Sequence, residues 1–285
     1  MHQIVAKSIL SKVKNDSFFG LTYNMNLYRG CQHACIYCDS RSDCYKIENF
    51  AQPSIKINAI NLLEKELART KIKGTIGFGS MNDPYMPLES RYRLSRKALE
   101  IISKKHFPIH IITKSNLVIE DINLIKEISK TYAAISFSFT TADDYIAKVT
   151  EPFAPSPSLR FEAINELAKK GIYTGITLMP VLPFINDNEK SVNDIVEKAH
   201  KYGAKYIIPY FGVTLRKGSR EFFFKKLDAN FTGVREKYEN HFENKYFCDS
   251  LDAKQLYSFF YKRCFELGID TKMKFYQKEE QLKLF

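Results

Sequence analysis

Cys31, Cys35 and Cys38 stand within eight residues of one another, in the spacing C-x₃-C-x₂-C. Thiols this close in the chain must line one tight loop, so they predict a single metal or cluster site. A four-iron cluster normally takes four cysteine ligands, and a local set of three leaves one iron with an open coordination position. An amino-acid-like ligand can chelate that iron through its amino and carboxylate groups.

The open coordination position suggests S-adenosylmethionine as its ligand, but the three cysteines also allow two interpretations without a cluster. S-adenosylmethionine (SAM) ends in a methionyl group, which carries the amino and carboxylate groups that such an iron would bind. A zinc site is the first alternative, with Cys44 or His33 as a fourth ligand, although zinc usually shows paired C-x₂-C spacing. The second alternative is that the three cysteines are buried and bind nothing.

Short β-rich runs alternate with longer helical patterns along most of the chain. The expected strands are nearly continuous apolar runs, which is typical of a parallel sheet covered on both faces. They span residues 21–28, 75–79, 109–113, 133–140, 173–179 and 206–211. The three cysteines follow the first of these strands, and barrel enzymes build their sites at the carboxyl ends of strands.

Amphipathic stretches separate the strands and predict helices. They span residues 59–68, 91–104, 121–129, 159–169 and 189–201. The order β(αβ)₅ implies a parallel sheet with right-handed crossovers. Six strands are too few for a closed eight-stranded barrel, so the expected fold is α/β, a partial (β/α)₆ TIM-like barrel.

The alternation of expected strands and helices ends after Val213. Three helices are expected there, at residues 219–227, 231–239 and 252–266, followed by a polar tail. We therefore expect a barrel over residues 1–213, a C-terminal helical extension over 214–280 and a short separate tail over 281–285. No stretch approaches the ~18 apolar residues that a membrane span needs, and the N-terminus has no signal-peptide core, so a cytoplasmic protein without membrane partners is expected.

The cysteine motif resembles that of the radical SAM superfamily, which often places an aromatic residue before the last cysteine, against the adenine of SAM; here that residue is Tyr37. Further segments are similar to the spore photoproduct lyase group and together cover about residues 20–215. They are residues 77–85 with Glu89, residues 112–115, Ser136 and Ser138, Glu151 and Pro152 with Pro155 and Arg160, and residues 179–183.

The resemblance implies a 4Fe–4S cluster held by Cys31, Cys35 and Cys38, SAM as the second cofactor, and an external one-electron reductant. SAM would be cleaved at the reduced cluster to methionine and a 5′-deoxyadenosyl radical, which would take a hydrogen atom from a substrate C–H bond. The chemistry would be the cofactor's, and the protein would orient SAM and exclude water.

Side chains at the ends of the later strands are candidate SAM contacts. Lys114 would pair with the SAM carboxylate, and Asn82 and Asp83 would bind its amino group or the ribose hydroxyls. Ser136 and Ser138 share a strand face and would bond the ribose. The remaining candidates are Tyr37 and Ser80, which are expected to contact the cofactor, and Arg160, which could bind a carboxylate or a substrate phosphate.

Two positions depart from the lyase family. Spore photoproduct lyases use a cysteine on the second-strand loop as hydrogen donor, and the matching residue here is Ser80, a much poorer hydrogen-atom donor. The position after the third cluster cysteine, tyrosine in that family, is Asp39. Cys44, Cys248 or Cys264 could supply a donor or a second cluster, although ordinary core or surface cysteines are the simpler interpretation.

Charge and the chain end both point toward DNA. Lys and Arg outnumber Asp and Glu by 43 to 32, a net charge of +11, which favours a polyanion. The last five residues resemble the peptide by which bacterial repair proteins bind the DNA polymerase sliding clamp, with Gln281, Leu282, Leu284 and Phe285 as contacts.

The first hypothesis is therefore a radical SAM enzyme acting on DNA, by lyase-like repair of a pyrimidine lesion or by another base modification. A second hypothesis is the same chemistry on RNA, a peptide or a small molecule. A third, of another class, is a non-catalytic cluster or metal protein that binds nucleic acid.

Overall fold

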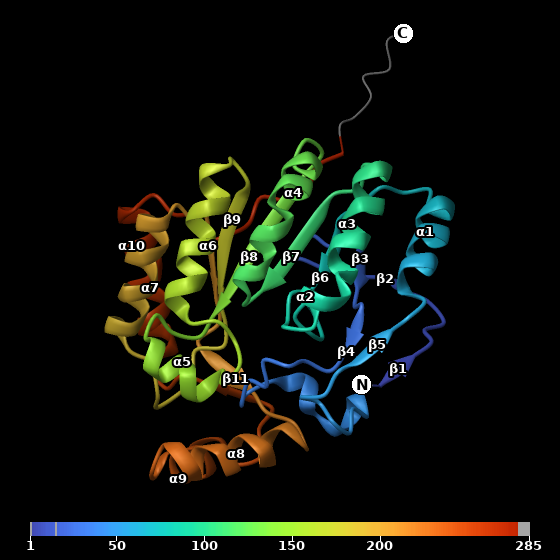
Figure 1. Ribbon diagram of the computed structural model, residues 1–285. Helices are drawn as coiled ribbons and strands as arrows, with labels where there is room; N and C mark the ends of the chain where they lie inside the picture. Colours follow the sequence, from blue (N-terminus) through green and yellow to red (C-terminus); the bar gives the residue numbers. More distant parts are fainter. Residues whose placement is uncertain (1, 15, 279–285) are drawn as a thin grey trace.

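The computed structural model describes residues 2–14 and 16–278, which form a mixed α/β fold around one seven-stranded sheet (Figure 1). Six strands run parallel and stand in sequence order across the sheet, and β2 adds an antiparallel edge beside β3. The strands are β2 (Leu10–Lys12), β3 (Tyr23–Met25), β6 (Ile76–Phe78), β7 (Ile109–Thr113), β8 (Ala133–Phe139), β9 (Tyr173–Leu178) and β10 (Ile207–Pro209).

The expected parallel β(αβ)₅ order is confirmed. β2 and β10 stand at opposite edges of the sheet, and no pairing joins them within the part of the chain that the structure describes. The finer assignment to a partial barrel stays a prediction. The crossover helices are α1 (Ala59–Arg69), α3 (Leu94–Lys105), α4 (Ile122–Ile128), α6 (Pro157–Lys169) and α7 (Glu189–Tyr202).

Burial on both faces of the sheet explains the continuous apolar runs in the central strands. Every residue of β8 is buried, because helices α4 and α6 pack against one face and side chains such as Tyr206 fill the other. A strand covered on both faces needs apolar residues at consecutive positions rather than at alternate ones. This is why the central strands appear in the sequence as continuous apolar runs.

The first expected strand, 21–28, is two strands in the structure. β3 ends at Met25, and the chain then enters a second sheet as β4 (Tyr28–Arg29). There Tyr28 pairs with Ile55 of β5 (Ser54–Lys56), which also pairs with β1 (Gln3–Ile4). This small sheet lies directly before the three cysteines and holds the start of their loop.

The expected helix 91–104 is also divided. A short helix, α2 (Glu89–Tyr92), precedes α3, and Arg93 between them has a positive φ of 50°. The Glu89 carboxylate accepts hydrogen bonds from Ser95 N at 2.7 Å and Arg96 N at 3.3 Å, so it caps the start of α3. The carboxylate also accepts a hydrogen bond from the Tyr28 hydroxyl.

The segment after Val213 packs on two different parts of the molecule. Helices α8 (Ser219–Asn230) and α9 (Val234–Phe242) form an apolar cluster with Cys35, Ile36 and Tyr37, and α10 (Ala253–Glu266) packs on α7 in the main core. The antiparallel pair of β11 (Gly212–Thr214) and β12 (Phe247–Asp249) joins the two, and α8 and α9 lie between these strands in the chain. Figure 1 shows α8 and α9 below the sheet, at the end where the parallel strands finish.

Among residues 2–14 and 16–278, no helix is both long enough and apolar enough to cross a membrane. Residues 281–285, which carry the expected clamp-binding motif, lie outside the described part of the chain. The tail prediction therefore has no structural counterpart here.

Candidate active site

The three cysteines lie on the cysteine loop, residues 30–38, which follows β4. Gly30 opens it with φ of +91°, and a Cβ at this position would stand 2.6 Å from the carbonyl oxygen of Phe50. That carbonyl accepts a hydrogen bond of 2.8 Å from Cys31 N. Only glycine allows the backbone to approach so closely with a positive φ, and the close approach fixes where the first thiol begins.

The three thiols line one cavity of about 150 Å³, here called the thiol cavity. Cys31 and Cys35 are buried and Cys38 is partly buried. Burial raises the pKa of Cys31 to about 12, and the nearby Asp83 carboxylate adds to this effect. Burial also raises the pKa values of Cys35 and Cys38, and the cation of Lys114 opposes the rise at both.

The donor set of this cavity suits a four-iron cluster. Cys31, Cys35 and Cys38 all line it, and no further cysteine does so among the described residues. A zinc ion needs ligand atoms within about 2.3 Å of a common point, whereas a four-iron cluster is held by thiolates at its separate corners. The donor set therefore fits a cluster.

A buried charge network forms the wall beside these thiols. The Glu151 carboxylate, placed directly after α5 (Asp144–Thr150), accepts hydrogen bonds from the Tyr37 hydroxyl and from the Arg160 guanidinium. Lys114 Nζ lies 3.9 Å from Glu151 Oε1 and donates a 2.9 Å hydrogen bond to Ser138 Oγ. The network brings strand ends β7 and β8 together with the cysteine loop.

The two cations set the charge state of this network. Burial alone would raise the pKa of Glu151, but Arg160 and Lys114 outweigh it and hold that pKa below its ordinary value. Burial alone would lower the pKa of Lys114, but the negative charges of Cys35, when it is deprotonated, and of Glu151 outweigh it and raise that pKa. Both groups are therefore charged at neutral pH, and Lys114 presents a positive charge to the thiol cavity.

Asp83 connects three loops around the same cavity. Its carboxylate accepts hydrogen bonds from Thr113 Oγ1 at 2.7 Å, Lys114 N at 2.6 Å and Tyr85 N at 2.8 Å, and His33 Nε2 lies 3.1 Å away. Although burial opposes ionisation, His33 and these donors lower the pKa of Asp83 to about 2. The charged carboxylate thus ties the end of β7 to the cysteine loop.

The structure brings six of the eight sequence-predicted cofactor contacts to the thiol cavity. They line it together with Cys31, Cys35 and Cys38, and they are Tyr37, Ser80, Asn82, Asp83, Lys114 and Ser138. Most of them already have protein partners. Asn82 Nδ2 donates to Tyr28 O at 2.8 Å, for example, and Ser80 Oγ bonds the side chains of Asn24 and Asn26.

The structure does not bring Ser136 or Arg160 to the cavity lining. Ser136 shares a face of β8 with Ser138 but lies deeper, and its hydroxyl bonds His110 Nε2 at 2.7 Å and Tyr206 Oη at 2.6 Å. Arg160 is fully buried and donates to Glu151, Ser138 O and Pro155 O. Ser136 supports the sheet interior, and Arg160 positions Glu151.

Sequence reasoning gave no role to Glu151 or Arg41, and it considered His33 only as a fourth ligand of the alternative zinc site. Glu151 carries the buried network, and the only signal for it was a Glu-Pro pair inside a resembling segment. His33 contacts Asp83 from within the cysteine loop. The Arg41 guanidinium lies over the rings of Phe50 and Phe222, 4.6 and 4.0 Å from their centroids, and adds positive charge near Cys38.

A family model described as the radical SAM superfamily matches residues 25–199, more than half of the chain. That range contains the cysteine loop, four of the six parallel strands in full (β6, β7, β8 and β9) and the last residue of β3. The chain belongs to the radical SAM superfamily. Its members use a 4Fe–4S cluster and S-adenosylmethionine, so these are the cofactors of this enzyme.

Sequence relatives include proteins of an archaeon, a bacterium and a phage. An uncharacterized protein of Methanocaldococcus jannaschii is 31% identical over 203 residues, covering 71% of this chain and 74% of that protein. An uncharacterized protein of Mycobacterium tuberculosis is 29% identical over 230 residues, covering 78% and 67%. The radical SAM Nalpha-GlyT isomerase of Pseudomonas phage M6 is 24% identical over 181 residues, covering 64% and 37%.

Among solved structures, the fold is similar to spore photoproduct lyase complexed with dinucleoside spore photoproduct. The TM-score is 0.70 at 14% identity, covering 94% of this chain and 80% of that one. A variant of the same lyase with bound AdoMet and the dinucleoside has a TM-score of 0.65 over 88% of this chain and 76% of that chain. At this identity the likeness shows a shared fold.

Proposed function

We propose that this radical SAM enzyme acts on DNA, by repairing a pyrimidine lesion as a lyase or by modifying a base. The main support for the proposal is how much of the chain the structural similarity to spore photoproduct lyase covers. The family match ends at residue 199, but the structural likeness covers 94% of the chain. Substrate choice usually depends on the parts added to a shared fold, and a likeness over 94% of the chain must include much of the segment after residue 199.

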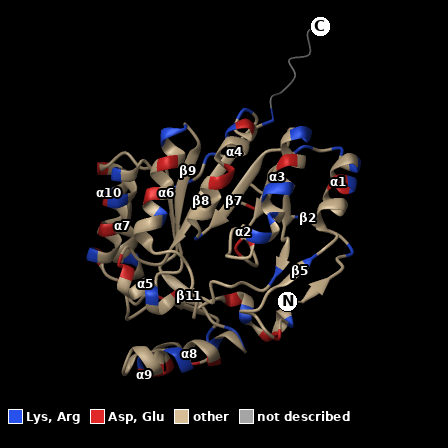
Figure 2. Ribbon diagram, in the orientation of Figure 1, with Lys and Arg blue, Asp and Glu red and all other residues tan. Residues whose placement is uncertain are grey.

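The net charge supports a polyanionic substrate. Lys and Arg exceed Asp and Glu by 11, which favours binding to phosphates. Figure 2 shows basic and acidic residues interspersed along the outer helices rather than gathered on one of them. The net positive charge therefore supports nucleic acid as the substrate class, but its distribution does not indicate which face of the protein binds it.

The cofactor contacts are part of the same proposal. Cys31, Cys35 and Cys38 would hold the cluster, which would supply the electron for SAM cleavage, and Lys114 would bind the SAM carboxylate. Tyr37, Ser80, Asn82, Asp83 and Ser138 lie where they can contact the rest of SAM. The thiolate ligands and the external one-electron reductant suit a reducing compartment, so the proposal includes a cytoplasmic location.

The test is incubation of the reconstituted, dithionite-reduced enzyme with SAM and DNA under anaerobic conditions. Release of 5′-deoxyadenosine is compared for ultraviolet-irradiated DNA, untreated DNA and RNA, and the bases are analysed by mass spectrometry. We expect DNA to change the rate of SAM turnover and one base product to change in mass or retention. SAM turnover that is the same with every nucleic acid would rule out the DNA substrate.

A second candidate is isomerisation of a modified base, which one feature of the cavity favours. Beyond the three cluster cysteines, no other cysteine lines the thiol cavity among the described residues. A radical that rearranges within one substrate needs no outside thiol to donate a hydrogen atom. The phage relative is named as an isomerase. A product of unchanged mass and altered chromatographic retention would distinguish isomerisation from lesion cleavage.

We also propose that the C-terminal residues Gln281, Leu282, Leu284 and Phe285 bind the DNA polymerase sliding clamp. The support is the sequence pattern alone, a glutamine followed by the apolar residues Leu282, Leu284 and Phe285. Deletion of residues 281–285 should abolish clamp binding in a pull-down or calorimetric titration and leave cluster and SAM binding intact. Unchanged affinity for the clamp after deletion would exclude this contact.

A further inference from the structure

The His33 ring lies between two oxygen acceptors. Its Nδ1 lies 3.2 Å from the carbonyl oxygen of Phe153, and its Nε2 lies 3.1 Å from Asp83 Oδ2. A carbonyl oxygen and an ionised carboxylate have no proton to donate, so each ring nitrogen must hold one. These two acceptors therefore assign His33 as an imidazolium, the doubly protonated and positively charged form.

Asp83 is the counter-charge of this imidazolium. Its carboxylate accepts hydrogen bonds from Thr113 Oγ1 at 2.7 Å, Tyr85 N at 2.8 Å and Lys114 N at 2.6 Å. Burial alone would raise the pKa of Asp83, but His33, Thr113 and Lys114 outweigh it and lower that pKa to about 2. Only 2% of the His33 side chain and 7% of the Asp83 side chain are exposed, so the two charges form a buried ion pair.

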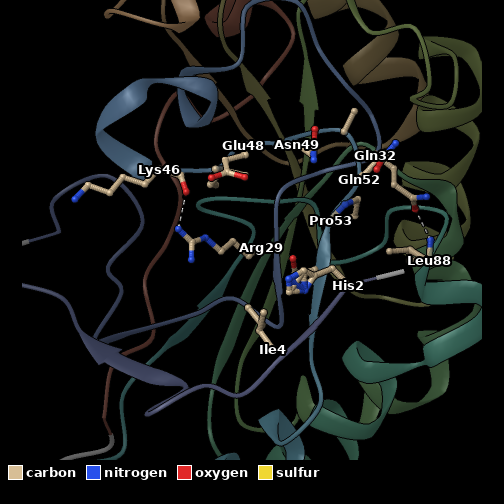
Figure 3. A pocket seen from close by; sticks show the side chains of 13 residues that line it. His2, Ile4, Arg29, Gln32, Lys46, Glu48, Asn49, Gln52, Pro53 and Leu88 are labelled. Atoms are coloured by element: carbon tan, nitrogen blue, oxygen red, sulfur yellow. Dashed lines mark hydrogen bonds between the residues drawn. The ribbon is translucent and has the colours of Figure 1, made fainter.

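Contacts on both sides of the cysteine loop hold the His33 ring in place. Gln32, its neighbour, lines a separate cavity of about 570 Å³, where the Gln32 amide oxygen accepts a 2.7 Å hydrogen bond from Leu88 N (Figure 3). His33 itself lines the thiol cavity, and its carbonyl oxygen accepts a 3.3 Å hydrogen bond from Phe153 N. The loop therefore presents Gln32 to one cavity and His33 to the other.

The Nε2 atom of His33 is available to a group bound in the thiol cavity. It is buried and has no hydrogen-bond partner among the described residues, although Asp83 lies within ion-pair distance. A buried N–H group without an acceptor lowers stability, so a bound group that brings an acceptor is favoured here. The sulfur atoms of an iron–sulfur cluster accept such hydrogen bonds.

The ion pair lies beside the first cysteine of the loop. Cys31 lines the thiol cavity together with His33 and Asp83. After burial, the negative charge of Asp83 is the largest cause that raises the pKa of Cys31, so the two groups interact through space. The same carboxylate would repel an electron added to a cluster held by Cys31.

We propose that the His33 imidazolium raises the reduction potential of the cluster, through its positive charge and its Nε2–H group. One electron passes from an external one-electron reductant, which is oxidised, to the cluster, which is reduced, and no bond forms or breaks. The added negative charge is stabilised by a nearby cation and by hydrogen bonds to sulfur, and it is destabilised by an anion. The inference rests on superfamily membership and on Cys31 as a ligand, and it does not depend on the DNA substrate.

Asp83 stabilises the fold but opposes reduction of the cluster. Its carboxylate ties the end of β7 to the cysteine loop through Thr113 and Lys114 N, and it stays charged beside Cys31. His33 offsets this charge and leaves those hydrogen bonds intact. Removal of the His33 charge would leave a buried anion next to the cluster, and this predicts that the reduction potential falls.

The test compares substitutions that change one charge at a time. His33→Gln removes the cation, so the one-electron reduction should become about ten-fold less favourable, a fall of about 59 mV. His33→Lys keeps a cation beside Asp83, and its potential should stay close to that of the unmodified enzyme. The double variant His33→Gln with Asp83→Asn removes both charges and should recover most of the loss. The matched control is His200→Gln, at an exposed position on α7.

The readout is the midpoint potential of the cluster in the absence of SAM and DNA. It is measured anaerobically by redox titration with mediator dyes, and the electron paramagnetic resonance signal of the reduced cluster is followed. Bound iron is determined for every variant, so that potentials are compared only between cluster-loaded proteins. A purely structural role for His33 would change the amount of bound iron and not the potential of the loaded cluster.

Three results would overturn the inference. Equal potentials of His33→Gln and His200→Gln would show that His33 does not act on the cluster. A potential of the double variant or of His33→Lys as low as that of His33→Gln would show that charge is not the cause. Loss of bound iron from both His33→Gln and His33→Lys would mean that His33 holds the cluster rather than sets its potential. Iron retained by Cys31→Ala would instead reject the proposed ligand set, and a failed DNA substrate would leave these measurements valid.

Discussion

The Arg160 guanidinium donates a hydrogen bond to the Glu151 carboxylate, and only 1% of either side chain is exposed. Arg160 also bonds the carbonyl oxygens of Ser138 and Pro155, each at 2.9 Å. The pair thus joins the end of β8 to the loop after α5. Glu151 also contacts Tyr37 and Lys114, which line the thiol cavity. The Arg160–Glu151 pair therefore fixes the position of one wall of that cavity.

Removing one member of this pair should destabilise the protein strongly. Arg160→Met leaves a buried carboxylate with fewer partners, and we expect a loss of about 3 kcal/mol in the free energy of unfolding. Urea denaturation of the cluster-free protein measures it. The double variant Arg160→Met with Glu151→Gln should lose less than the sum of the single changes. Strict additivity would mean that the two side chains do not stabilise each other.

Lys114 should be needed for SAM binding. Its ammonium faces the thiol cavity, and a charge-assisted hydrogen bond to a carboxylate contributes about 1.5–3 kcal/mol. Lys114→Met should therefore weaken SAM binding about ten- to hundred-fold, measured by equilibrium dialysis with the cluster-loaded enzyme. Iron content should stay unchanged, and the surface variant Lys130→Met should bind SAM normally. Unaltered SAM affinity would restrict Lys114 to its contacts with Ser138 and Glu151.

The cluster should depend on three cysteines and not on the others. Substitution of Cys31, Cys35 or Cys38 by alanine should reduce bound iron to background after reconstitution, whereas Cys44→Ala and Cys264→Ala should retain it. Burial raises the pKa of Cys31 to about 12, so ligation must displace a proton, and reconstitution should speed up as pH rises. Retained iron in a Cys38→Ala variant would contradict this ligand set.

Glu89 should make stability depend on pH. Burial raises the pKa of Glu89 from 4.5 to about 7, so the fold favours the protonated carboxyl. The resulting stability is fully present below pH ~4.5 and is lost as pH rises through ~7, a change of about 3 kcal/mol. Glu89→Gln resembles the protonated form and should flatten the unfolding free energy between pH 5 and 8. Identical pH profiles for both proteins would show that Glu89 titrates normally.

Ser80 should decide where the hydrogen atom in the product comes from. Ser80 lines the thiol cavity, and the sequence resemblance predicts that it matches the cysteine donor of the lyase family. Ser80→Cys places an exchangeable thiol there, so turnover in D₂O should add deuterium to the product, and the unmodified enzyme should add none. Mass spectrometry of the product reads out the difference. Deuterium in both products would point to another exchangeable donor in the unmodified enzyme.

The cysteine spacing is enough to predict that three thiols share one loop, and the apolar runs are enough to predict the order of the strands. Three thiols within eight residues can converge only on one loop, and continuous apolar runs appear where both faces of a sheet are covered. The lysine at the end of the third expected strand was also predictable, because the carboxyl ends of parallel strands meet at one edge.

Which polar side chains share the cavity could not be predicted from local sequence patterns and depends on the fold. Strand alternation places Ser136 and Ser138 on the same face of β8, so the sequence does not distinguish them. In the structure Ser136 bonds the buried His110 and Tyr206 in the interior, whereas Ser138 lines the thiol cavity. Glu151 lies in a loop without periodicity, so no local pattern reveals that Arg160 and Lys114 hold its charge. Burial and charge pairing arise from residues far apart in the chain, and for that reason they are properties of the fold.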